Sequence, residues 1–120
     1  MFSKGEQNIS KHQFLISGIL TTVFGIDELC PKAQVVCLWL HHGRLGTWES
    51  MQPLACHVIQ AWNARSRSEL SVHSSKGLIA VAFDQRNHGS RKIDSRANKD
   101  WRAGNKTHAQ DMYSIYRTIT

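Results

Sequence analysis

Two continuous apolar segments constrain the fold most: VVCLWL, residues 35–40, and GLIAVAF, residues 77–83. Neither segment alternates apolar with polar residues, which is typical of strands covered on both faces, as in parallel sheets. Between them, apolar residues recur at helical spacing: Trp48, Met51, Ala55, Val58, Ile59 and Trp62. Thr47 or Ser50 can cap this helix. Residues 35–83 therefore predict a strand–helix–strand unit with parallel strands.

The flanking sequence extends this unit. Residues 12–28 are rich in β-branched and aromatic side chains and predict one or two strands, which Gly18 and Gly25 interrupt where a hairpin or a bulge can lie. Residues 107–119 predict a second helix, and Thr107 and Gln110 have the spacing of a capping box. A chain of 120 residues has the length of one domain, so we expect a single α/β domain over residues 1–120.

The net charge of +6 raises the question of a nucleic-acid partner. Seven of the 15 basic residues lie in one segment: Arg86, Arg91, Lys92, Arg96, Lys99, Arg102 and Lys106. Asp84, Asp94 and Asp100 alternate with them, and no RNP, KH, zinc-finger or basic-helix signature accompanies them. A solvated basic loop is therefore favoured over a nucleic-acid surface.

Cysteine spacing and the apolar N-terminal segment bear on location. Cys30, Cys37 and Cys56 form no C-x-x-C pair, so we expect reduced, buried thiols in the cytoplasm. Residues 14–26 loosely resemble the apolar part of a signal peptide, but Glu6 precedes them and no A-x-A site follows. The segment is also shorter than the roughly 20 residues of a membrane span, so no membrane partner is expected.

The loop LHHGRLGTW directly follows the first parallel strand, where ligand and catalytic loops of open α/β sheets lie. Gly43 frees the backbone to present amide groups, and the N–H of Arg44 can then serve as an oxyanion donor. The alternative is a plain turn in which His42 bonds a neighbouring carbonyl. The sequence leaves both interpretations open.

The second strand runs into AVAFDQRNHGSR, a loop crowded with titratable residues. Asp84 can accept backbone N–H groups and can pair with Arg86 or His88. Asn87 tolerates the left-handed backbone conformation and Gly89 adopts it without cost. An internally hydrogen-bonded turn is therefore favoured over direct catalysis.

No metal, cofactor or nucleophile signature is present. Adjacent His41 and His42 diverge in an extended chain, and H-x-H, H-E-x-x-H and C-x-x-C spacings are absent. No serine lies in a G-x-S-x-G elbow, and Ser90, which follows Gly89, has no second glycine. We therefore identify no catalytic residue and expect no metal or cofactor.

Together, the histidine–glycine pair after one strand and D-x-R-x-H-G after the next resemble the front half of an α/β-hydrolase. Many members of that superfamily read D-x-R-G-H-G-x-S at the second turn. AVAFDQRNHGSR and a later W-x-x-GN-x-x-HA-x-DM are most similar to a fungal branch of the superfamily. The later signature is carried by Trp101, Gly104, Asn105, His108, Ala109, Asp111 and Met112.

The resemblance implies roles for two groups of residues. His42, Gly43 and Arg44 correspond to the oxyanion loop, with the Arg44 amide facing the oxyanion. The turn that shapes the site corresponds to Asp84, Arg86, Asn87, His88 and Gly89. Two positions depart from the superfamily pattern: Asn87 replaces the usual first glycine, and Arg91 stands where serine is common.

The resemblance also implies a partial α/β-hydrolase sheet: an N-terminal hairpin, two parallel strands and flanking helices, truncated before the nucleophile elbow. The triad would then lie beyond Thr120, so ancestral hydrolysis of ester or related acyl bonds would be lost in the fragment. An ester-type substrate is expected only for a full-length domain. The alternatives are an interaction module, self-associating through the exposed strand 35–40, and a basic nucleic-acid binder.

Overall fold

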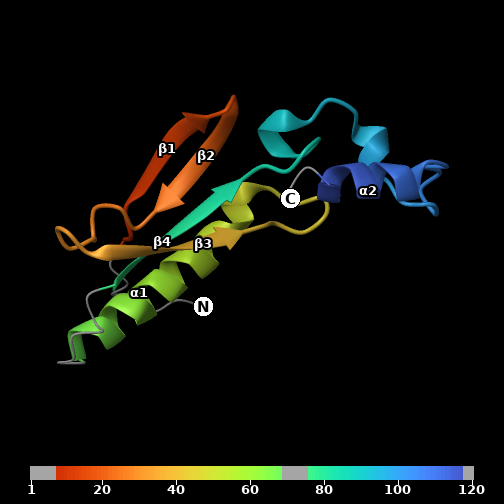
Figure 1. Ribbon diagram of the computed structural model, residues 1–120. Helices are drawn as coiled ribbons and strands as arrows, with labels where there is room; N and C mark the ends of the chain where they lie inside the picture. Colours follow the sequence, from red (N-terminus) through yellow and green to blue (C-terminus); the bar gives the residue numbers. More distant parts are fainter. Residues whose placement is uncertain (1–7, 69–75, 118–120) are drawn as a thin grey trace.

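The computed structural model describes residues 8–68 and 76–117 (Figure 1). Its elements, in chain order, are β1 (Lys11–Ile16), β2 (Ile19–Phe24), β3 (Gln34–Leu40), η1 (Trp48–Met51), α1 (Gln52–Ser68), β4 (Lys76–Phe83), η3 (Gly89–Arg91), η4 (Ser95–Asn98) and α2 (His108–Arg117). Part of the polar connection between α1 and β4, residues 69–75, lies outside the described residues.

The strands form one mixed sheet in the order β1-β2-β4-β3. The β1–β2 and β2–β4 pairs are antiparallel, whereas β3 and β4 are parallel. Ser17 and Gly18, with φ of 49° and 78°, make a two-residue turn between β1 and β2. The predicted α/β architecture, a hairpin plus two parallel strands with flanking helices, is confirmed.

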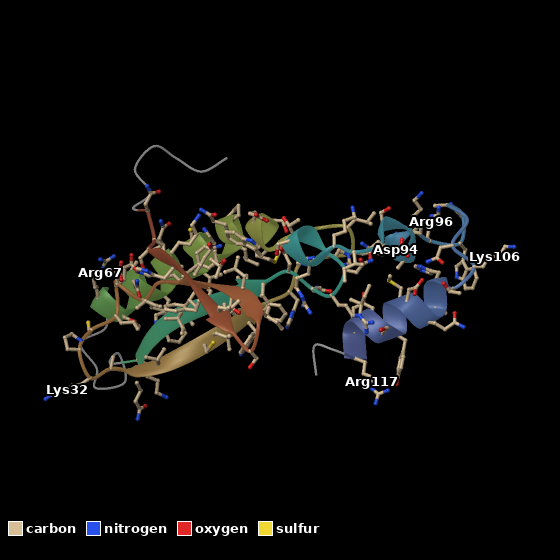
Figure 2. All side chains as sticks on the ribbon, turned by 90° about the horizontal axis from the view of Figure 1, so that it is seen from above. Lys32, Arg67, Asp94, Arg96, Lys106 and Arg117 are labelled. Atoms are coloured by element: carbon tan, nitrogen blue, oxygen red, sulfur yellow. The ribbon has the colours of Figure 1, made fainter. Side chains whose placement is uncertain are left out.

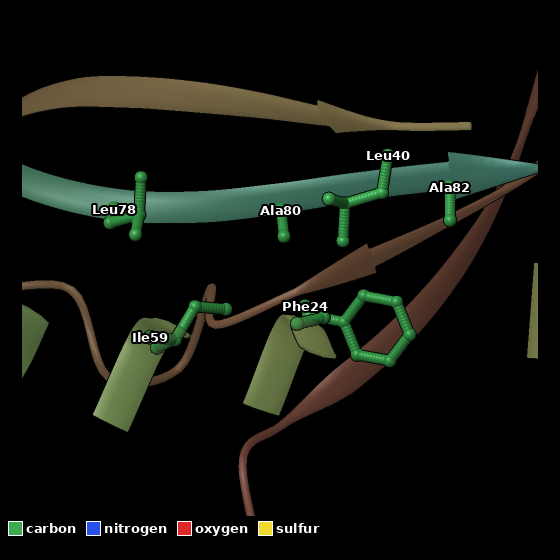
Figure 3. Packing of buried hydrophobic residues seen from close by; sticks show 7 residues of the cluster. Phe24, Leu40, Ile59, Leu78, Ala80 and Ala82 are labelled. Atoms are coloured by element: carbon green, nitrogen blue, oxygen red, sulfur yellow. The ribbon is translucent and has the colours of Figure 1, made fainter. Parts of the chain in front are cut away.

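Helix α1 covers one face of the sheet and closes the hydrophobic core (Figure 3). Ile59 and Ala55 of the helix are fully buried. They belong to the same cluster as Ala80 and Ala82 of β4, whose small side chains let the helix backbone approach the sheet closely. Pro53 lies in the first turn of α1, where a missing N–H costs no hydrogen bond.

The opposite face of β3 is bare, so the prediction that this strand is covered on both faces is wrong for the described residues. Side chains alternate along a strand, so Leu38 and Leu40 pack toward the core whereas Val35 and Trp39 point away. Val35 is 47% and Trp39 57% exposed. Trp39 meets the edge of the Phe83 ring at 6.1 Å between centroids.

The chain is elongated, with extents of 57 × 33 × 21 Å. Lys32 and Arg67 lie at one end, and Lys106, on the loop that precedes α2, lies at the other (Figure 2). The radius of gyration, 17.5 Å, exceeds the value of about 13.6 Å expected for a compact chain of this length. The long loop after β4, together with α2, therefore extends beyond the carboxyl ends of the parallel strands.

The cysteines and helices bear on the expected location. Cys30 and Cys37 are exposed and Cys56 is partly buried, so the expectation of buried thiols is wrong. Within residues 8–68 and 76–117, no helix has the length and apolar content needed to cross a bilayer.

Candidate functional site

Two loops leave the carboxyl ends of β3 and β4 side by side. The parallel register places Leu40 opposite Ala82, so the loops beginning at His41 and Asp84 start as neighbours. Ligands of open α/β sheets bind at this edge. Both sequence-predicted groups of site residues lie here.

His42 joins the two loops. Its side chain is 3% exposed, its Nε2 accepts the backbone N–H of Gln85 at 3.0 Å, and its Nδ1 lies 2.8 Å from the Gly43 carbonyl. A backbone N–H can only donate, so the ring proton is on Nδ1 and is donated to Gly43. The Gln85 amide returns a bond to the His42 carbonyl at 2.5 Å. Both ring nitrogens are therefore used in holding the loops together.

His88 makes the reciprocal connection. Its Nε2 accepts the backbone N–H of Leu45 at 3.1 Å, and its Nδ1 lies 2.9 Å from the Arg86 carbonyl. The same reasoning places the ring proton of His88 on Nδ1. The His42 and His88 rings lie 5.1 Å apart between centroids. The two buried histidines thus clamp the loops, and Leu45 is held at a positive φ of 67°.

Asp84, which is buried, stabilises the turn after β4 with its carboxylate. Its carboxylate accepts the backbone N–H of Trp48 at 2.9 Å and both the N–H and the hydroxyl of Ser90 at 2.9 Å. Among described residues it pairs with neither Arg86 nor His88. The predicted cap by Thr47 or Ser50 does not form: the Thr47 side chain makes no cap bond, and the Ser50 hydroxyl donates to the Thr47 carbonyl. Asp84 takes the first N–H of η1 instead.

Asn87 organises the rest of the loop. It has a positive φ of 62°, and its side-chain oxygen accepts the N–H groups of Ile93 and Asp94, each at 2.8 Å. Asn98, which is buried, donates to the Asn87 carbonyl at 2.7 Å. Asn87 therefore combines the left-handed conformation that a glycine would allow with side-chain bonds that a glycine lacks.

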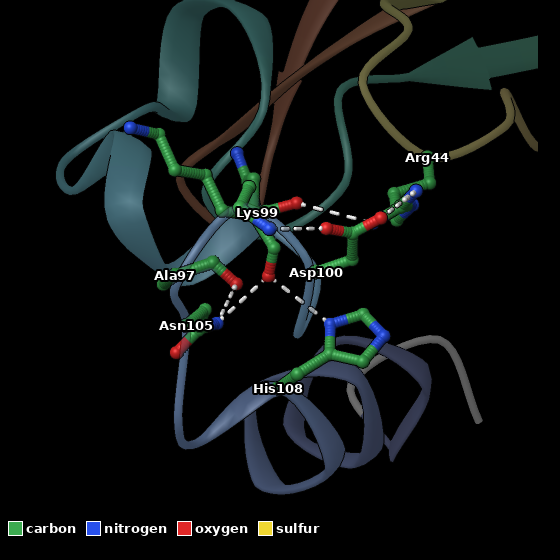
Figure 4. Close-up of polar contacts among 8 residues, drawn as sticks. Arg44, Ala97, Lys99, Asp100, Asn105 and His108 are labelled. Carbon is green, nitrogen blue, oxygen red and sulfur yellow. Dashed lines mark hydrogen bonds and ion pairs between the residues drawn. The ribbon is translucent and has the colours of Figure 1, made fainter.

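Residues of the W-x-x-GN-x-x-HA-x-DM motif bind the loop that precedes α2, residues 99–107, to that helix (Figure 4). The Asn105 amide donates to the Lys99 carbonyl and to the Asp111 carboxylate, each at 2.9 Å. His108 Nδ1 lies 3.1 Å from the same Lys99 carbonyl. The Thr107 hydroxyl lies 3.0 Å from the Asp111 carboxylate, and the predicted capping box with Gln110 is absent from the described contacts. Sequence reasoning identified this motif without assigning it this role.

The proposed oxyanion residues combine a fixed loop with free amides. The backbone N–H groups of Gly43 and Arg44 donate to no described residue, while the Gly43 carbonyl accepts from Gly46 at 3.0 Å. A Cβ added at Gly43 would meet nothing within 4 Å, so the space beside this residue is open. The Arg44 guanidinium turns away, 4.0 Å from the Asp100 carboxylate and 3.5 Å from the Asn98 carbonyl (Figure 4).

In the described part of the chain, no group of three or more His, Cys, Asp or Glu side chains is placed to hold a metal ion. The clamp histidines have no free ring nitrogen for such a role. The fold and the site therefore define an α/β protein with two hydrogen-bonded loops at the carboxyl edge of its parallel strands.

Comparisons with models of known protein families and with curated proteins give no match. Among solved structures, the chain is similar to TT1662 from Thermus thermophilus, with a TM-score of 0.43 and 18% sequence identity. The similarity covers 91% of this chain and 41% of that chain, so this chain spans less than half the length of TT1662. A likeness this distant assigns neither a family nor an activity.

Proposed function

We propose that this chain forms the oxyanion side of a hydrolase site for ester or related acyl bonds. The assignment to α/β-hydrolases, and to their fungal branch, depends on the two sequence motifs. The observation that carries it is the pair of consecutive N–H groups at Gly43 and Arg44, which have no partner among the described residues, on a loop clamped by His42 and His88. Donors already fixed in place stabilise the negative oxygen that develops in acyl transfer.

The nucleophile must come from another segment or another chain under this proposal. The hydroxyl of Ser90, which follows His88 by two residues, donates to buried Asp84 at 2.9 Å. His88 uses both ring nitrogens in backbone contacts, so it is not free to act as a base for Ser90. An ester-type substrate is accordingly proposed only for the site completed by that nucleophile.

The 120-residue chain alone is expected to hydrolyse p-nitrophenyl acetate no faster than a heat-treated sample. Without an activated nucleophile, an oxyanion loop has no tetrahedral intermediate to stabilise. Turnover that a single Ser→Ala change abolishes would contradict this. Reading the coding frame beyond Thr120 for a strand followed by G-x-S-x-G, together with mass spectrometry of co-purified chains, then tests the proposal itself. Absence of a nucleophile from both would sink it.

The Arg44 amide is expected to exchange with solvent deuterium at least about tenfold faster than the Leu45 amide. The two residues are adjacent, but only Leu45 donates its N–H, to His88 Nε2 at 3.1 Å. Amide exchange followed by NMR makes the comparison within one loop. Equal protection of the two amides would mean that the Arg44 donor is already occupied and would remove the basis for an oxyanion role.

A second candidate function is self-association through β3. Within the described sheet, β3 pairs only with β4, leaving its other edge open. The strand carries no charged side chain. The other edge strand, β1, carries the charged Lys11, and His12 of the same strand lies 2.9 Å from the Asp27 carboxylate; a charged side chain on an edge discourages edge pairing. A second copy is the proposed occupant because an open, uncharged strand edge can pair with its own copy. An antiparallel pair centred on β3 would place Cys37, its central residue, on the two-fold axis.

The chain is expected to form dimers or larger species at micromolar concentration, and Trp39→Lys is expected to disperse them. Trp39 is 57% exposed on β3, so a charge there opposes burial against a second copy. Phe14→Lys on β1, at a site 45% exposed, is the matched control and should leave the assembly intact. Analytical ultracentrifugation distinguishes these outcomes. A wild-type monomer that unfolds cooperatively at this concentration would contradict the proposal.

Cysteine cross-linking tests the register of the proposed pair of β3 strands. Although Cys37 is exposed, desolvation by the neighbouring protein atoms raises the pKa of its thiol, so oxidation is best carried out at alkaline pH, where more thiolate forms. Cross-linked dimers should disappear in Cys37→Ser and persist in Cys30→Ser. The reverse pattern would exclude pairing centred on Cys37. Cys30 and Cys37 are free thiols, which supports our proposal of a cytoplasmic location.

A further inference from the structure

The loop after β4 and helix α2 line an open cavity of about 750 Å³, and neither Gly43 nor Arg44 is among its lining residues. Cations from the basic segment line it, at Arg86, Arg91 and Lys92, together with the hydroxyl-bearing Ser90 and Ser114. The volume lies within the range of roughly 300–1,000 Å³ typical of small-molecule sites.

Both arginines are anchored through neutral oxygens. Arg86 Nη1 donates to the Ser114 hydroxyl at 2.5 Å, and Arg91 Nη1 donates to the Asp84 backbone carbonyl at 2.9 Å. Neither guanidinium forms an ion pair with a carboxylate of the described residues. Each guanidinium carries five N–H donors in a fixed plane, so each keeps donors for a ligand.

The two carboxylates on the cavity wall are engaged elsewhere. Asp94 accepts the backbone N–H of Arg96 at 2.9 Å, and Asp111 accepts the Asn105 amide at 2.9 Å. Neither neutralises Arg86 or Arg91. The cavity wall therefore carries three cations and two carboxylates, an excess of one positive charge, and its two arginines are not paired with either carboxylate.

We propose that this cavity binds a small molecule through a phosphate or carboxylate group held between Arg86 and Arg91. Planar guanidinium groups match the geometry of such oxyanions, and charge-assisted bonds of this kind are about twice as strong as neutral ones. Lys92 adds charge at the cavity wall. The proposal does not depend on acyl hydrolysis, because it involves neither the Gly43 nor the Arg44 amide.

The test is a titration of the ¹⁵N-labelled full chain with phenyl phosphate, and separately with benzoate, followed by NMR. Saturable shifts of the Ser90 and Arg91 amides are expected with at least one of the two anions, and Arg86→Gln should weaken that binding about tenfold. Arg86 is exposed, so its replacement leaves the core intact. Arg102→Gln, the loss of an equally exposed cation that does not line the cavity, is the control and should change affinity less than twofold.

Three outcomes would overturn the proposal. The first is no saturable shift with either anion, and the second is equal weakening of anion binding by Arg86→Gln and Arg102→Gln. The third is displacement of the anion by mixed-sequence DNA, with an affinity for DNA that also falls in Arg102→Gln. The last would assign the basic segment to nucleic acid instead. Arg91→Lys keeps the positive charge but loses the planar guanidinium that can donate two parallel N–H bonds, so it should weaken anion binding. The far-UV circular dichroism spectrum of this variant should be unchanged. Ester turnover reports on the other site, so either proposal can fail alone.

Discussion

Replacing Asp84 with alanine is expected to lower the free energy of unfolding by about 4 kcal/mol. The carboxylate is 3% exposed and accepts three hydrogen bonds, from the Trp48 N–H and from the N–H and hydroxyl of Ser90. Bonds to a charged acceptor contribute about 1.5–3 kcal/mol each, but Ser90 is exposed, so water replaces part of its two bonds after the deletion and the total loss stays near ~4 kcal/mol. Urea unfolding followed by circular dichroism, under conditions where the chain is monomeric, measures the loss.

Asp94→Ala is the matched control for Asp84. Asp94 also accepts a backbone N–H at the start of a short helix, from Arg96 at 2.9 Å, but it is exposed. Its loss should cost about 1 kcal/mol, as for an ordinary cap. Equal losses for the two substitutions would show that Asp84 is a local cap and not the link between the turn and η1.

Gly89→Ala is expected to lower the free energy of unfolding by about 3 kcal/mol. Gly89 has a positive φ of 51°, and an added Cβ would overlap the Asp84 carboxylate. The carboxylate would have to move and give up its bonds to Ser90, in addition to the backbone strain. Gly104→Ala is the control, because Gly104 has a φ of 92° but nothing within 4 Å of the added Cβ. It should cost about 1 kcal/mol.

If the added Cβ of Gly89→Ala acts by displacing the Asp84 carboxylate, the losses of unfolding free energy in Asp84→Ala and Gly89→Ala should be non-additive. Asp84→Ala removes the three atoms that the Gly89 Cβ would overlap, so Gly89→Ala should then cost only the backbone strain of about 1 kcal/mol. A double-mutant cycle by urea unfolding gives the coupling directly. Fully additive losses would mean that backbone strain, and not displacement of the carboxylate, accounts for the effect.

The sequence predicted the strands and the order of elements well, because these depend on short-range patterns. The apolar segments at 35–40 and 77–83 became the parallel pair, and Gly18 marked the hairpin turn. Each of these signals lies within the element that it predicts.

The candidate site was located from sequence, but its contacts were not. The position of the two loops followed from parallel strands ending at one edge of the sheet. The Trp48 partner of Asp84 did not follow, because Trp48 lies 36 positions away, whereas the expected partners Arg86 and His88 lie nearby in sequence. The roles of Asn105 and Asp111 were missed for a related reason, since their bonds depend on how the loop of residues 99–107 folds back onto α2.

By itself, the sequence determined the α/β class, the hairpin, the parallel strands and the place where two polar loops meet. Local periodicity reports which side of an element is apolar, and that is sufficient for these features. Only the tertiary structure decided that His42 and His88 clamp the loops, that Asp84 caps a helix distant in sequence, and that Val35 and Trp39 of β3 are exposed. Periodicity cannot report what covers an apolar face, and contacts across 36 to 43 positions depend on the path of the whole chain.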